Sequence, residues 1–155
     1  MWDKLRQLVQ GFGGEAAPSP TRFEQQQIAA AALLIEAARL DGTFDQNERD
    51  HLAGVLRKHF ELSDADVQSL IGEAERSVAD SVEWQGFTRT VKDGFDHEGR
   101  IAVIEMLWQV AYADGELHDY EASLLRRVAG LIYVSDRESG EARKRVLARL
   151  GRDPG

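Results

Sequence analysis

Proline is confined to the two ends of this chain of 155 residues, because Pro18, Pro20 and Pro154 are its only prolines and residues 21–153 contain none. Proline is excluded from helix interiors but is common in turns and at the edges of sheets. The same stretch also lacks the alternating β-branched and aromatic runs that indicate strands. The sequence therefore predicts an all-α fold, with helices over about residues 22–40, 45–60, 64–79, 83–93, 98–113, 119–132 and 136–150.

An internal repeat organises the helical stretch. A shift of 73 residues superposes two sets of residues without a gap: Leu34, Ala38, Asp41, Gly42, Glu48, Leu52 and Val55 fall on Leu107, Ala111, Asp114, Gly115, Glu121, Leu125 and Val128. Each copy has the pattern helix, Asp-Gly turn, helix, and a single hairpin of this kind cannot bury its apolar face alone. We therefore expect two pseudo-symmetric helical hairpins within a compact bundle of seven to eight helices.

The two Asp-Gly turns, residues 41–48 and 114–121, share the pattern D-G-x-Φ-x-x-x-E and hold three and four acidic residues in a chain of net charge −8. This spacing equals the second half of an EF-hand loop, including the Glu that binds calcium through both oxygens. The acidic residues of the first half are missing, which excludes a complete calcium loop. What remains is a pair of half-sites, with candidate metal ligands Asp41, Glu48, Asp114 and Glu121 and further candidates Asp45, Glu116 and His118.

The same turns also have a simpler structural interpretation. Gly42 and Gly115 occupy the position that ends a helix in the left-handed conformation. Asp45 and Glu48 are spaced as a capping box. An Asp at the C-terminal end of a helix typically loses about 0.3–1 kcal/mol against the helix dipole, so Asp41 and Asp114 are harder to explain in this way. The sequence alone leaves both interpretations open.

Composition excludes several classes of function. The absence of cysteine rules out disulfides, thiolate zinc sites, iron–sulfur clusters and cysteine nucleophiles. The acidic balance argues against nucleic acid as a partner, since that affinity depends on neutralising phosphates. No apolar run reaches the roughly 18 residues of a membrane span, and no glycine loop or serine–histidine arrangement indicates catalysis. We therefore expect a cytoplasmic protein that is not an enzyme.

Residues 1–20 are expected to form a separate N-terminal part, followed by one helical domain over residues 21–152. The apolar residues of its first half recur at helical spacing: Trp2, Leu5, Leu8, Val9 and Phe12. The Gly-, Ala- and Pro-rich residues 13–20 then read as a flexible linker. Such a short amphipathic helix would pack against its own domain or a neighbouring copy, or bind a membrane surface weakly through residues 2–12.

The doubled pattern A-x-x-D-G-x-Φ-x-x-x-E, in an all-helical chain of this length, resembles the bacterial tellurite-resistance TerB family. Residues 101–121 look especially like its uncharacterised TerB-like branch. The resemblance covers residues 23–148 and implies a cytoplasmic helical bundle linked to chemical stress, which acts in membrane-associated complexes or senses cations, without established catalysis. By position, the acidic residues that it singles out are Asp41, Glu48, Asp114 and Glu121. Tellurite itself is an oxyanion, which these carboxylates would repel.

The leading hypothesis is therefore a non-enzymatic module whose acidic turns bind or sense a divalent cation, or present an acidic surface to a protein partner. Oxygen ligands favour Ca²⁺, Mg²⁺ or Mn²⁺, and His118 leaves Zn²⁺ as a weaker candidate. The alternative is a structural domain for protein–protein or membrane-surface contact, in which the turns only cap helices. A metalloenzyme with its carboxylates inside the bundle would require both turns to point into one shared pocket.

Overall fold

The computed structural model describes residues 23–40, 44–81, 83–113, 117 and 119–151. These residues form seven α-helices and contain no strand, which confirms the predicted all-α fold. The helices are α2 (Gln25–Ala38), α3 (Gln46–Phe60), α4 (Asp64–Asp80), α5 (Gln85–Gly94), α6 (His97–Ala111), α7 (Asp119–Leu131) and α8 (Asp136–Arg149). None of the described helices is both long and apolar enough to cross a membrane. The predicted N-terminal helix and linker, residues 1–20, lie outside the described residues, so the predicted division of the chain stays a prediction.

Side-chain caps fix where most of the helices begin. The Oγ of Ser63 accepts a hydrogen bond from the N–H of Asp66, and the Oγ of Ser135 accepts one from the N–H of Glu138, both at 3.1 Å. Such caps satisfy N–H groups that have no partner within the helix. The predicted ends at residues 40 and 113 were two residues too late. The N–H groups of Leu40 and Ala113 bond to carbonyls three residues back, so the chain tightens beyond Ala38 and Ala111.

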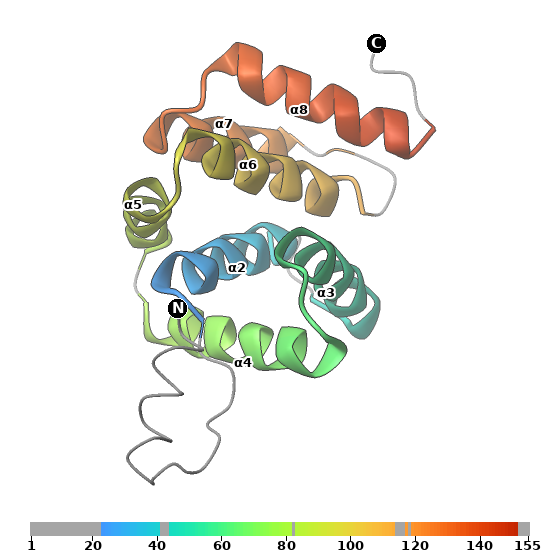
Figure 1. Cartoon of the computed structure of the whole chain (residues 1–155). Coiled ribbons are helices and arrows are strands. Elements are labelled where there is room, and N and C mark those ends of the chain that lie inside the picture. The colour runs from blue at the N-terminus through green and yellow to red at the C-terminus, as the bar shows by residue number, and fades with distance from the viewer. Residues whose placement is uncertain (1–22, 41–43, 82, 114–116, 118, 152–155) are drawn as a thin grey trace, which may run out of the picture.

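The helices form two groups, as Figure 1 shows. One group contains α2, α3 and α4, and the other contains α6, α7 and α8, while α5 lies at one side between them. Helix α2 is central, because it contacts α3, α4, α5 and α6. Helix α6 holds a similar place in the second group, since it contacts α7 and α8 as well as α2 and α3.

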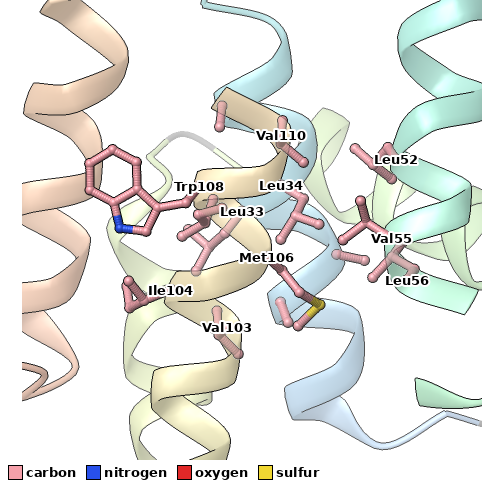
Figure 2. Close-up of a cluster of buried hydrophobic side chains, with 14 of the residues drawn as sticks. Leu33, Leu34, Leu52, Val55, Leu56, Val103, Ile104, Met106, Trp108 and Val110 are labelled. Carbon is pink, nitrogen blue, oxygen red and sulfur yellow. The ribbon is translucent and has the colours of Figure 1, made fainter. Parts of the chain in front are cut away.

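Figure 2 shows part of the core where α2, α3 and α6 meet. Leu33 and Leu34 of α2 and Leu107 of α6 are 0% exposed, and α2 also buries four consecutive alanines at residues 29–32. Small side chains let neighbouring helices approach closely, and leucines fill the spaces between them. The two helices with the longest buried stretches are therefore the two at the centre of the bundle.

The order of the helices follows the sequence repeat. Helices α6, α7 and α8 follow α5 and begin 72 or 73 residues after α2, α3 and α4, respectively. After the second helix of each group, Glu61 (φ 55°) and Tyr133 (φ 63°) take the left-handed conformation, and a capping serine, Ser63 or Ser135, follows two residues later. The members of each pair are 72 residues apart, whereas the repeat has an offset of 73. The second copy is therefore one residue shorter than the first before this point. The expected two-fold symmetry in space stays a prediction.

Gly94 marks the closest approach of α5 to α2. A Cβ atom at Gly94 would lie 2.6 Å from the Cβ of Gln26, which is fixed to the backbone of α2 and cannot move aside. The carbonyl of Gly94 also accepts a hydrogen bond from Nε2 of Gln26 at 3.1 Å. The variant Gly94→Ala is expected to lower the free energy of unfolding by about 1–3 kcal/mol, because the two helices must separate. Urea denaturation followed by far-UV circular dichroism measures this loss.

Gly86, in the same helix, supplies the matched control. No atom lies within 4 Å of a Cβ built there. Gly86→Ala should therefore leave stability unchanged or raise it by up to about 1 kcal/mol through helix propensity. Equal effects of the two substitutions would contradict the close contact at Gly94.

Candidate functional site

The first acidic turn leads directly into α3, and its two described carboxylates cap that helix. Oδ1 of Asp45 accepts a hydrogen bond from the N–H of Glu48 at 2.9 Å. In return, Oε1 of Glu48 accepts one from the N–H of Asp45 at 3.0 Å. This is the reciprocal capping box that the spacing predicted. Asp41, the remaining carboxylate of this turn, lies outside the described residues.

The second turn is described only in part. Asp114, Glu116 and His118 lie outside the described residues, and Glu121 is a half-buried residue in the first turn of α7. Within the part of the chain that the structure describes, no three His, Asp or Glu side chains are grouped so as to hold a metal ion. Of the four main candidate metal ligands, the structure therefore describes Glu48 and Glu121. Asp41 and Asp114 lie outside the described residues.

The helices that lead into the two turns have related positions. Helices α2 and α6 pack against each other. Both run in the same direction across the bundle, so that their C-terminal ends lie at the same end of the molecule (Figure 1). Helices α3 and α7 leave from that end. The bundle thus places the C-terminal ends of α2 and α6, which precede the two acidic turns in the sequence, at one end.

A cleft of about 290 Å³ opens between α3, α6 and α8. We call it the α3–α6–α8 cleft. Its apolar lining includes Val55, Tyr112 and Val146, and Lys58 and Arg149 line it as well. Nε2 of His51, also in the lining, hydrogen-bonds to the carbonyl of Gln109 at 3.0 Å and so joins α3 to α6. Since a carbonyl only accepts, this nitrogen carries the proton.

Glu105 on α6 is the charged residue most deeply buried in the described part of the chain, at 8% exposure. Its Oε1 accepts a hydrogen bond from Nε of Arg145 at 2.9 Å, and its Oε2 accepts one from Nη2 of Arg149 at 2.6 Å. Burial alone would raise the pKa of Glu105, but the hydrogen bonds and charges of the two arginines outweigh it and hold this pKa below its ordinary value. The carboxylate therefore stays ionised and holds α8 against α6.

The charges of Glu105 and Arg149 also affect the pKa of His59, which lies near the end of α3. Burial lowers the pKa of His59 below its ordinary value, the Glu105 carboxylate opposes this shift, and the positive charges of Arg149 and Lys58 add to it. The imidazole is therefore mainly neutral at pH 7.

Sequence reasoning missed the Glu105 cluster. Arg145 and Arg149 are exposed residues of the basic stretch in α8, and both also bind Glu105. The signal was present: Glu105 is the one charged residue in the run IAVIEMLWQVA, residues 101–111. A carboxylate inside an apolar helix requires partners, although the sequence does not say which.

The comparisons with known proteins agree with this fold. Residues 27–144 match the family described as tellurite resistance protein TerB. Among solved structures, a protein of unknown function from Porphyromonas gingivalis W83 is similar with a TM-score of 0.55 and 18% identity, over 84% of this chain and 97% of that one. That likeness concerns the fold alone, and no curated protein matches the chain. Since the family match extends over well more than half of the residues, as the doubled motif led us to expect, this chain belongs to the TerB family.

Proposed function

We propose that this TerB-family module is not an enzyme and that it binds or senses a divalent cation through its two acidic turns as part of a bacterial stress response. One observation carries the proposal: α2 and α6, which precede the turns, pack together and end at the same end of the bundle (Figure 1). The acidic turns follow these two helix ends in the sequence. Oxygen ligands of this kind favour Ca²⁺, Mg²⁺ or Mn²⁺ over Zn²⁺.

The capping box is compatible with such a role. Asp45 and Glu48 each accept a backbone N–H in this cap through one carboxylate oxygen, and the cap itself involves no other side chain. A Gln can replace Glu at this position of a capping box. Glu48→Gln therefore preserves the cap while it removes a negative charge from the proposed ion site.

Isothermal titration calorimetry with Ca²⁺, Mg²⁺, Mn²⁺ and Zn²⁺ tests the proposal. Binding of at least one ion is expected, with an affinity at least about tenfold weaker in Asp41→Asn, Asp114→Asn and Glu48→Gln. Asp80→Asn is the control, because this exposed carboxylate lies at the end of α4, outside both turns. Neither heat nor a thermal shift with any of the four ions at millimolar concentration would refute the cation site.

The second candidate function is a structural domain that contacts a protein partner, a second copy or a membrane surface and holds no ion. The reciprocal cap between Asp45 and Glu48 favours it, because both carboxylates are explained without a metal. In that case Asp114→Asn leaves the free energy of unfolding unchanged or slightly raises it, since a charge opposed to the helix dipole is removed. It also leaves binding to a partner unchanged.

A further inference from the structure

We propose that the α3–α6–α8 cleft binds a small amphiphilic carboxylate, a molecule with an apolar body and one carboxylate group. The apolar body would lie on the floor of the cleft, and the carboxylate would lie beside Lys58 and Arg149. Its lining residues lie outside residues 41–48 and 114–121, and the proposal does not depend on a bound cation.

The size and lining of the cleft favour a small molecule. Its volume of about 290 Å³ lies near the lower limit of ligand pockets. Val55, Tyr112 and Val146 line it although each is at most 8% exposed, so they form its floor. Leu150, which is 49% exposed, adds an apolar group to its edge. A partner helix or protein would need a contact surface far larger than this cleft provides.

Gly54 keeps the cleft open. It lies inside α3 and lines the cleft, and no atom lies within 4 Å of a Cβ built there. A glycine inside a helix costs about 0.5–1 kcal/mol relative to alanine. Packing within the described residues does not require this glycine, so its effect on the structure is the space that it leaves in the cleft.

The charges at the edge of the cleft favour an anion. Among the described residues, Lys58 has no carboxylate within ion-pair distance, although the protein as a whole carries a net charge of −8. Arg149 bonds to Glu105 through Nη2, but a guanidinium has five N–H donors and keeps others for a ligand. Asp50 also lines the cleft, but it lies eight residues before Lys58 on α3, so its negative charge is about 12 Å along the helix axis from Lys58.

His51 lies in the same lining and bears on the choice of ligand. Its Nε2 is held by the Gln109 carbonyl, so it strengthens the wall of the cleft between α3 and α6. Lys58 lies seven residues later on the same helix, about 10 Å along its axis. A ligand of about that length can therefore place its apolar end near His51 and its carboxylate near Lys58.

Titration with octanoate, followed by calorimetry and by ligand-observed NMR, tests the proposal. Octanoate is expected to bind, whereas octylamine, with the same apolar body and the opposite charge, is not. Lys58→Gln should weaken octanoate binding about tenfold by removing a charge-assisted hydrogen bond. Chelation of divalent ions with EDTA should leave it unchanged, which separates this site from the proposed cation site.

Three glycine variants locate the site. Gly54→Leu fills the cleft and is expected to abolish octanoate binding, whereas Gly54→Ala keeps it. Gly130→Leu is the matched control, because Gly130 also has open space for a side chain but lies on α7, outside the cleft. Equal binding of octanoate and octylamine, unchanged binding in folded Gly54→Leu, or no octanoate binding at millimolar concentration would overturn the proposal. If Gly54→Leu does not fold, Lys58→Gln alone decides, and unchanged binding there overturns it as well.

Discussion

Leu107→Ala is expected to lower the free energy of unfolding by about 3–4 kcal/mol. Leu107 is 0% exposed in the centre of α6, so the substitution removes apolar contacts and leaves a cavity that the surrounding helices fill only in part. Leu34, its counterpart in the sequence repeat, is equally buried in α2 and should lose a similar amount when it is replaced by Ala. Urea denaturation followed by circular dichroism measures both losses.

The control for these core variants is Leu131→Ala. Leu131 ends α7 and is 45% exposed, so its truncation is expected to change stability by about 0.5 kcal/mol or less. A loss at Leu107 as small as that at Leu131 would contradict the central position of α6. A large loss at Leu107 with a small one at Leu34 would instead show that the two copies of the repeat contribute unequally to the core.

Glu105→Gln is expected to lower the free energy of unfolding by about 2 kcal/mol near pH 7. The substitution keeps the size of the side chain but leaves the Arg145 and Arg149 charges without their carboxylate. Breaking a fully buried pair costs about 3–5 kcal/mol, and the expected loss is smaller here because both arginines are about half exposed. Glu75→Gln, which removes a more exposed carboxylate from a single pair with Arg49, should cost about 1 kcal/mol or less.

The effect of Glu105→Gln should depend on pH in a defined direction. The pKa of Glu105 is lower in the folded protein than its ordinary value. Its stabilisation is therefore complete above the unfolded pKa of about 4.3 and is lost as the pH falls through the folded pKa. The difference in stability between wild type and Glu105→Gln should shrink below about pH 4.

Glu138 titrates in the same acidic range but does not disturb this comparison. Its hydrogen bond with His97, at 2.6 Å, is the largest cause that lowers the pKa of Glu138 to about 2. Both proteins retain this pair, so its contribution cancels in their difference. Denaturation curves between pH 3 and pH 7 measure the effect, and a difference that stays constant with pH would contradict the assigned ionised state of Glu105.

Much of the fold could be predicted because its signals are local. Residues 21–153 contain no proline, and Asp45, Ser63 and Ser135 each stand before a helix with an acidic residue three positions later. Those features act within one helical turn, so they can be recognised without tertiary contacts. The predicted ends at residues 40 and 113 were less accurate, because the last turn of a helix readily changes its hydrogen-bond pattern.

The candidate sites could be predicted only where their chemistry is local. The Asp45–Glu48 capping box follows from spacing alone, and the structure confirms it. The Glu105 cluster joins residues 40 and 44 positions apart, and no pattern within α6 or α8 states which arginines approach that carboxylate. The α3–α6–α8 cleft likewise has lining from three helices that are far apart in the sequence.

The sequence by itself determined the helical class, the order of the helices, most of their starts and the family, since proline placement, caps and the doubled Asp-Gly motif are properties of short segments. Only the tertiary structure decided that α2 and α6 occupy the centre, that Arg145 and Arg149 neutralise Glu105, and that Gly54 faces an open cleft. The physical reason is that helix propensity and capping act over a few residues. Burial and charge pairing depend instead on which distant helices pack together.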